Sequence, residues 1–165
     1  MDNEQLKKEI IDILVHDAKQ TPADIAGMLK QPEDKVRSLI ELMENEGTIL
    51  AYKAVVNRTK VESSKTQCII EVQCSPQRGV GFDDIAKRIY KFPEVKSLFL
   101  MSGGYDLFIL VEGTTMQDIA FFVAEKLATL EHVKSTSTHF LLKRYKEDGF
   151  ILDDQERPPR LAVTP

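Results

Sequence analysis

The sequence lacks a long hydrophobic run. None of its apolar stretches approaches the roughly 18 consecutive residues that a membrane-spanning helix needs. The N-terminus, MDNEQLKKEI, is polar and acidic, unlike a secretory signal peptide. We therefore expect no contact with a membrane and a cytoplasmic location.

Cysteine is scarce, since only Cys68 and Cys74 occur among the 165 residues. Both lie in TQCIIEVQC, and in a strand they would be about 20 Å apart, too far to form a disulfide bond with each other. We expect two buried free thiols. The cysteines and histidines show no paired spacing of metal ligands, so the sequence predicts no metal site and no cofactor.

Signatures of catalysis are also missing. The sequence shows no nucleophile with a partner base, no phosphate-binding loop and no paired carboxylates in a recognisable cleft. We therefore expect a binding protein rather than an enzyme. Hydrophobic residues make up 42% and charged residues 29% of the chain, which favours folded globular domains over a disordered or fibrous protein.

Apolar residues recur at helical spacing three times in the N-terminal third. The first segment covers residues 4–15. A second helix begins at Pro22 with Thr21 as its N-cap, and a third runs from Pro32 to Gly47. Three short helices with tight connections predict a helix-turn-helix.

The segment after Gly47, TILAYKAVV, alternates enough to form a pair of strands or an extended arm, which would make the helical unit winged. The polar stretch NRTKVESSK follows it. We therefore assign residues 1–57 to a winged helix-turn-helix domain and residues 58–65 to a linker.

From Thr66 onward the period of the apolar pattern changes. It predicts strands over residues 66–74, 95–101, 105–112 and 133–145, and helices over residues 82–91 and 115–129. This β-α-β-β-α-β order is that of a ferredoxin-like domain, an antiparallel sheet with both helices on one face, so the chain as a whole is α+β. The expected inward residues of the two helices are Phe82, Ile85, Ala86 and Ile89, then Met116, Ile119, Ala120, Val123 and Leu127.

We assign residues 66–149 to this ferredoxin-like domain and residues 150–165 to a C-terminal tail. The tail contains the apolar run Leu161 to Val163, which we expect to dock as a strand on a neighbouring subunit, with a disordered end as the alternative.

The strands on either side of SGGYDL are apolar on both faces. A sheet with helices on one side only should alternate apolar and polar residues. The runs LFLM and LFILV instead place large apolar groups on both faces. Something else must cover the helix-free face, and a second copy of the same sheet is the simplest cover. We infer a homodimer formed through this domain.

Three segments, in this order, resemble the Lrp/AsnC family of bacterial and archaeal transcription regulators. EGTILAYKAVVN resembles the exit of the family's third helix and the strand after it, and MSGGYDLFILVEG resembles its effector-domain signature. VKSTSTHFLLKRYK is similar to the family's final strand. The resemblance implies a helix-turn-helix that binds double-stranded DNA and an effector domain, often called RAM, that dimerises sheet to sheet. It further implies assembly beyond the dimer, often to octamers, and amino-acid effectors bound between dimers.

Carried over by position, the effector site consists of Ser102, Gly103, Gly104, Tyr105, Asp106, Thr136 and Thr138. Glycines can expose backbone N–H groups to a ligand carboxylate, an aspartate can accept from a ligand ammonium group, and threonine hydroxyls can serve either end. An alternative stays open: the glycines form a two-residue hairpin turn that Asp106 anchors, and the threonines are ordinary strand residues.

The resemblance places the third helix in the major groove of DNA. The candidate DNA contacts are Lys35, Arg37, Ser38 and Asp34. Residues 1–58 carry eight Lys and Arg against eleven Asp and Glu, a net charge of −3, which departs from the family's more basic recognition helix. Joining several modules in one assembly can compensate. Further phosphate contacts could come from Lys30, Lys53, Arg58 and Lys60.

Two other functions stay open. In one, the protein is an oligomeric amino-acid-binding module whose acidic helix-turn-helix contacts mainly protein. In the other it is an enzyme, because siroheme decarboxylases share this two-domain architecture. That reaction would need a histidine and arginines around a tetrapyrrole, and the candidates are His139, Arg78 and Arg88.

Overall fold

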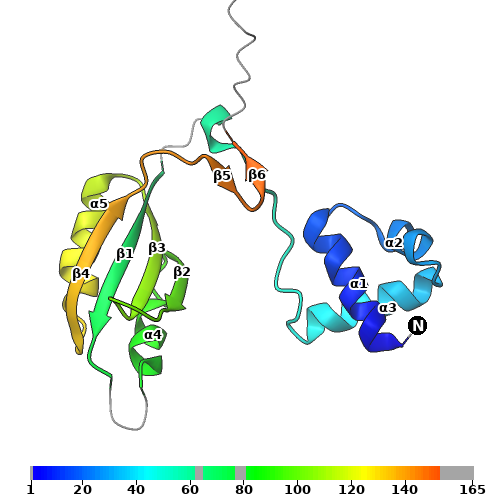
Figure 1. Cartoon of the computed structure of the whole chain (residues 1–165), viewed down its shortest axis with the longest axis horizontal. Helices are drawn as coiled ribbons and strands as arrows, with labels where there is room; N and C mark the ends of the chain where they lie inside the picture. Colours follow the sequence, from blue (N-terminus) through cyan, green and yellow to red (C-terminus); the bar gives the residue numbers. More distant parts are fainter. Residues whose placement is uncertain (1, 62–64, 77–80, 153–165) are drawn as a thin grey trace, which may run out of the picture. The chain divides into compact units, whose positions relative to one another are not determined.

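The computed structural model of the chain describes residues 2–61, 65–76 and 81–152 (Figure 1). The chain divides into two compact units, the first ending at Val56 and the second beginning at Asn57. The run Leu161 to Val163, which we expected to dock on a neighbouring subunit, lies outside the described residues. None of the described helices has the length and apolar character to cross a membrane.

Three helices form the first unit: α1 (Asn3–His16), α2 (Pro22–Leu29) and α3 (Glu33–Asn45). The predicted N-cap of α2 is confirmed. The Thr21 hydroxyl accepts a hydrogen bond from the Asp24 N–H at 3.2 Å, and the Asp24 carboxylate accepts from the Thr21 N–H at 3.0 Å. Residues 30–32 join α2 to α3, as in the predicted helix-turn-helix. The buried core consists of Leu6, Ile10, Leu14, Ile25, Ala26, Val36, Leu39, Ile40 and Met43.

The strand pair expected after Gly47 is absent. Residues 48–57 are all described and contain neither helix nor strand, so only the arm remains of the two alternatives. A strand needs a neighbour to pair with, and no strand occurs in the described part of the first unit. Tyr52 fixes the arm to α3, because its hydroxyl donates to the Glu44 carboxylate at 2.7 Å. Burial and this hydrogen bond raise the pKa of Tyr52 to about 12.

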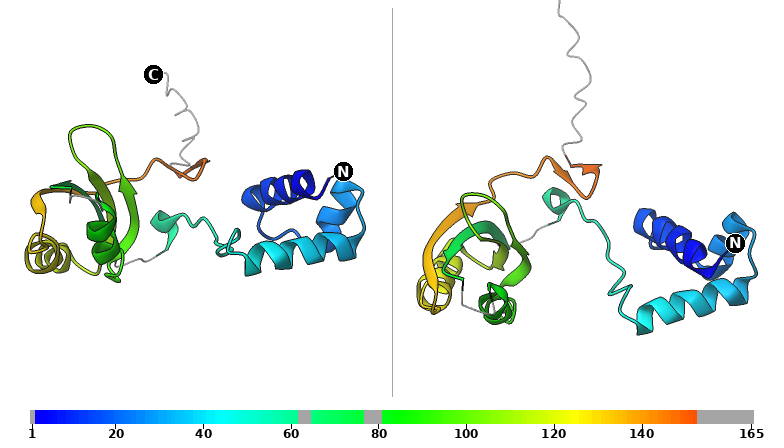
Figure 2. Two further views of the ribbon diagram at one scale, coloured as in Figure 1. Left: turned by 90° about the horizontal axis from the view of Figure 1, so that it is seen from below. Right: turned by 60° about the horizontal axis from the view of Figure 1, so that its bottom comes forward.

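A four-stranded antiparallel sheet forms the second unit. Its strands are β1 (Thr66–Cys74), β2 (Val95–Leu100), β3 (Leu107–Gly113) and β4 (Val133–Phe140), in the spatial order β2-β3-β1-β4. The helices are α4 (Asp83–Ile89) and α5 (Met116–Phe121), the second continued by the π-helical stretch η2 (Phe122–Leu127). Both helices lie on one face of the sheet (Figures 1 and 2), as predicted for a ferredoxin-like domain.

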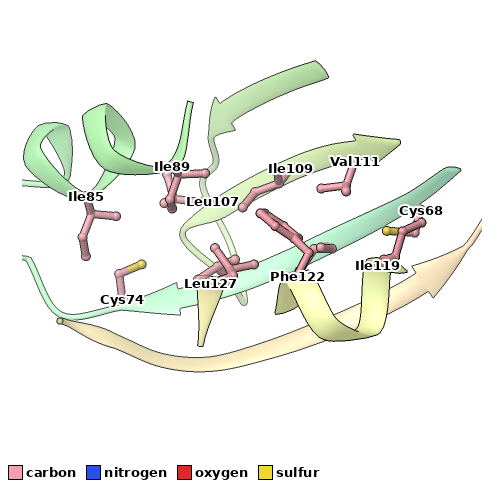
Figure 3. Close-up of a cluster of buried hydrophobic side chains, with 12 residues drawn as sticks. Cys68, Cys74, Ile85, Ile89, Leu107, Ile109, Val111, Ile119, Phe122 and Leu127 are labelled. Atoms are coloured by element: carbon pink, nitrogen blue, oxygen red, sulfur yellow. The ribbon is translucent and has the colours of Figure 1, made fainter. Parts of the chain in front are cut away.

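The core of the second unit lies between these helices and the sheet (Figure 3). It consists of Cys68, Ile70, Val72, Cys74, Ile85, Ile89, Leu107, Ile109, Val111, Ile119, Phe122 and Leu127. Cys68 and Cys74 are free and buried, as predicted. Burial raises the pKa of both thiols to about 11.

In the helix predicted over residues 115–129, Ile119 and Leu127 are buried and Val123 packs against the core, as expected, but the rest of the buried face differs. Met116 is 54% exposed and Ala120 is also exposed, whereas Phe122 is buried. The helix widens from α to π at Phe122, and the extra residue in that turn rotates the positions that follow, so that Phe122 and Leu127, five residues apart, both face the core. Met116 lies in the first turn of the helix, before the widening.

The last strand ends at Phe140 rather than at residue 145. Its neighbour β1 begins at Thr66, and the pairing of the two strands has already reached Cys68 opposite Phe140, so little of β1 remains to pair with. A separate hairpin follows, made of β5 (Lys146–Glu147) and β6 (Phe150–Ile151). The polar segment after the arm also contains structure, a 3-10 turn η1 (Arg58–Lys60).

Candidate functional site

The face of the sheet opposite the helices carries an apolar patch, which we define as Ile69, Phe99, Phe108 and Leu110. The strand register places Ile69 beside Leu110 and Phe99 beside Phe108. The two phenylalanine rings lie 6.1 Å apart, and Phe99 is 53% exposed. The prediction that large apolar groups occupy both faces of these strands is therefore confirmed.

A polar row runs beside this patch on the same face. It consists of Gln67, Glu71 and Gln73 on β1, and Ser135, Ser137 and His139 on β4. His139 Nε2 lies 3.7 Å from a carboxylate oxygen of Glu71 and 3.2 Å from Ser137 Oγ. The helix-free face is thus mainly apolar over β2 and β3 and mainly polar over β1 and β4.

The SGGYDL turn joins β2 to β3 at one end of this face. It is longer than a two-residue hairpin turn, because the N–H of Met101 donates to the carbonyl of Asp106 at 2.8 Å and four residues lie between them. Gly103 has a φ of 134°, a conformation that favours glycine. Residues 102–104 are exposed, so their backbone is open to a ligand.

Asp106 anchors this turn to β1. Its carboxylate accepts from the N–H of Cys74 at 2.7 Å, and its own N–H donates to the carbonyl of Val72 at 3.0 Å. The side chain of Gln73 adds a third link, since its Nε2 donates to the carbonyl of Gly104 at 2.8 Å. The anchoring role that the sequence left open for Asp106 is the one observed in the chain.

The predicted threonines do not meet the turn within one chain. Thr136 pairs with Val72 and Thr138 with Ile70, so both point to the helix-covered face and are half-buried. Since β1 lies between β4 and β3, two strand spacings, about 10 Å, separate the backbones of β3 and β4. Ser135 is instead linked to the turn through Gln73, because its hydroxyl donates to Gln73 Oε1 at 2.9 Å while Gln73 Nε2 donates to Gly104.

Gln73 and Ser135 were not among the predicted site residues. Gln73 could have been found from the alternation of β1, which places it two residues after Glu71 on the same face. Ser135 could not, because serines and threonines alternate in VKSTSTHF. A slip of one residue in register exchanges the two sets between the faces.

The predicted DNA contacts lie near the start of α3. Asp34, Arg37 and Ser38 are exposed, and Lys35 is half-buried. The Arg37 guanidinium donates to the Glu33 carboxylate one turn earlier, so part of its charge is neutralised. This ion pair further reduces the positive charge that α3 offers to DNA, in a domain whose sequence is already acidic.

Two residues considered for a tetrapyrrole lie far apart in the second unit. His139 is on the helix-free face, whereas Arg88 is exposed on α4, which covers the opposite face. Arg78 lies outside the described residues. The described residues also contain no group of three or more His, Cys, Asp or Glu side chains that could hold a metal ion.

Comparison with known proteins identifies the family. The model of the Lrp/AsnC ligand binding domain matches residues 67–151. The chain belongs to the Lrp/AsnC family. YugG of Bacillus subtilis, an uncharacterized HTH-type transcriptional regulator, is 42% identical over 158 residues, which cover 95% of each chain. LrpA of Pyrococcus abyssi, an HTH-type transcriptional regulator, is 27% identical over 139 residues, 84% of this chain and 96% of that one.

Solved structures of regulators share the fold. E. coli AsnC has a TM-score of 0.65 at 19% identity, and covers 89% of this Lrp/AsnC chain and 95% of its own. A transcriptional regulator of Neisseria meningitidis, solved in complex with L-Met, has a TM-score of 0.68 at 22% identity, with 89% and 93% covered. The predicted α+β architecture, a helix-turn-helix followed by a ferredoxin-like effector domain, is confirmed.

Proposed function

We propose that the protein is a DNA-binding transcription regulator that acts in the cytoplasm and responds to a small molecule, an amino acid or a related effector, bound by its second unit. The observation that carries this proposal is the combination of two parts in one chain. A helix-turn-helix forms one compact unit, and the domain that matches the Lrp/AsnC ligand binding model lies in the other.

A homodimer is the working form that we propose, with further assembly of dimers to a larger oligomer such as an octamer. The apolar patch on the helix-free face supports the dimer, because such a surface is costly to leave in water and a second copy would bury both patches at once. A dimer also supplies two recognition helices, which offsets the weak charge of each.

The effector site that we propose is built around the turn of residues 102–106. Its exposed backbone at Gly103 and Gly104 suits a ligand carboxylate. Thr136 and Thr138 face the other side of the sheet, so we propose that they join the site from a neighbouring subunit. The L-Met complex of the Neisseria regulator supports an amino acid as the class of ligand.

The test is DNA binding by the full chain to its own promoter region, followed at several salt concentrations and with each of the twenty amino acids. We expect binding to weaken steeply as salt rises, because phosphate contacts release counterions. Charge reversal of Lys35 and Arg37 should abolish binding, whereas Lys8→Glu, on an exposed part of α1, should preserve it. One amino acid should change affinity several-fold or more, which corresponds to a coupling of about 1–3 kcal/mol.

A second candidate function is an amino-acid-binding protein whose helix-turn-helix contacts protein rather than DNA. The acidic charge of the first unit and the pairing of Arg37 with Glu33 support it. Absence of any salt-dependent DNA binding, together with a change in oligomer size on adding one amino acid, would favour this function over the regulator. No response of any kind to the twenty amino acids would remove the effector claim from both.

A further inference from the structure

Glu112, near the end of β3, gathers three hydrogen-bond donors although its side chain is only 7% exposed. Its carboxylate accepts from Lys65 Nζ at 2.8 Å, from Gln67 Nε2 at 2.9 Å and from Arg58 Nη1 at 3.3 Å. The bond from Lys65 is the main cause that lowers the pKa of Glu112. The carboxylate is therefore held as an anion between two cations.

The two cations belong to the segment that leads from the first unit into the sheet. We call residues 57–61 together with Lys65 the connector. Arg58 opens the turn η1 near the start of the connector, and Lys65 directly precedes β1. Glu112 thus binds both ends of a segment that the sequence suggested was only a polar linker.

The C-terminal hairpin holds the same region. The side-chain amide of Asn57 donates to the carbonyl of Leu152 at 3.3 Å, and the N–H of Leu152 donates to the carbonyl of Tyr145 at 2.9 Å. Arg144 donates to both Gln67 Oε1 and the Glu147 carboxylate. The amide of Gln67 is therefore oriented by Arg144 while it donates to Glu112.

The arm is also fixed on the other side, within the first unit, by the hydrogen bond from Tyr52 to Glu44. Residues 53–56 lie between the two fixed points, Tyr52 and Asn57. At about 3.3–3.6 Å per residue, this span cannot exceed roughly 18 Å. If Glu112 released Arg58 and Lys65, the connector would keep the bond from Asn57 to Leu152 but lose its two ion pairs, so it would detach from the sheet more often and the tether would lengthen beyond Asn57.

We propose that Glu112 is a positioning residue that clamps the connector and so sets the length of the tether on which the first unit moves. A short tether raises the effective concentration of a second recognition helix once the first has bound. This consequence for DNA rests on the proposed function, whereas the clamp itself does not.

Motion of the first unit tests the clamp directly. A dye on Lys8→Cys reports that motion by time-resolved fluorescence anisotropy of the full chain, because Cys68 and Cys74 are buried and their raised pKa makes them poor targets for labelling. In Glu112→Gln we expect a larger amplitude of nanosecond depolarisation and about tenfold faster tryptic cleavage after Arg58. Glu112→Asp should restore much of the restriction.

The matched control is Glu94→Gln. Glu94 pairs with Lys126 at 2.6 Å in the same unit, and none of its described contacts is with the connector. Unchanged anisotropy and cleavage in Glu112→Gln would overturn the proposal, and so would an equal change in Glu94→Gln. If Glu112→Gln does not fold, the double variant Arg58→Gln with Lys65→Gln removes the same two ion pairs by changing the connector. An unchanged amplitude of depolarisation in this double variant would then overturn the proposal.

DNA with one or two half-sites tests the consequence. Glu112→Gln should weaken binding to paired half-sites by about tenfold and leave binding to a single half-site unchanged. A looser first unit with unaltered paired-site affinity would overturn the positioning role. If the wild-type chain binds no DNA at all, the proposed function fails. The clamp is then tested by the anisotropy and cleavage measurements alone.

Discussion

At the scale of single residues, two kinds of polar contact shape the chain. Thr21 forms a local contact, a capping box closed within three residues of itself. Gln73 and Glu112 form distant contacts, which join strands or bring the connector to the sheet. The local kind secures one helix end, whereas the distant kind fixes the turn and the connector relative to the sheet.

The capping box gives the simplest prediction at this scale. Thr21→Ala removes the hydroxyl that accepts from the N–H of Asp24, so the first unit should lose about 1 kcal/mol of unfolding free energy. This loss of unfolding free energy can be measured by urea denaturation, with circular dichroism as the signal. Ser38→Ala, which removes an exposed hydroxyl from within α3, should change the free energy by less than about 0.5 kcal/mol. Equal losses in the two variants would contradict the capping role.

Acid should loosen the cluster around Glu112. Its pKa is lowered in the folded chain, so its stabilising contribution is complete above the ordinary carboxyl pKa and is lost as pH falls through the lowered value. Near neutral pH, the unfolding free energy of the wild type should exceed that of Glu112→Gln by about 1–2 kcal/mol. The gap should shrink as pH falls below about 4. A gap that stays constant in urea denaturation from pH 7 to pH 3 would refute the charge-based account.

At the scale of elements, the helix that begins at Met116 shows how packing selects the buried face. Phe122 and Leu127 face the core across the π-helical stretch, together with Ile119, whereas Met116 in the first turn lies outside. The difference can be measured one residue at a time.

Ile119→Ala should cost about 2–5 kcal/mol of unfolding free energy, because it empties space in a closed core. Met116→Ala should cost less than about 0.5 kcal/mol, since that side chain is already in water in the single chain. Thermal or urea denaturation of both variants tests whether Met116 belongs to the buried face. A loss for Met116→Ala as large as that for Ile119→Ala would show that Met116 is buried together with Ile119, as the sequence predicted.

The main elements were predictable from the sequence, whereas their mutual fit was not. Local signals predict the three helices of the first unit and the main strands and helices of the second, as Thr21 and Pro22 predict α2, but they did not indicate the hairpin β5–β6 or the absence of a strand pair after Gly47. The register of β4 against β1 was not predictable either, because serines and threonines alternate in that strand and only the folded sheet shows that Ser135 bonds Gln73. The turn of the candidate site could be predicted from the sequence, whereas its neighbours on β1 and β4, Gln73 and Ser135, required the structure.

At the scale of the whole molecule, the account depends on the helix-free face of the sheet. Ile69, Phe99, Phe108 and Leu110 form an apolar patch there with no helix over it. A homodimer that covers the patch explains why both faces of β3 are apolar. It also brings neighbouring subunits together, which the proposed effector site and the paired recognition helices both require.

The molar mass of the chain in dilute solution, measured by light scattering or sedimentation, tests this claim most directly. The account predicts at least two chains of 18.7 kDa each for the wild type, and dissociation toward one chain for Phe108→Glu. Phe121→Glu, at an exposed phenylalanine on α5, should still give at least two chains. A wild-type chain that stays folded at 18.7 kDa would contradict the account.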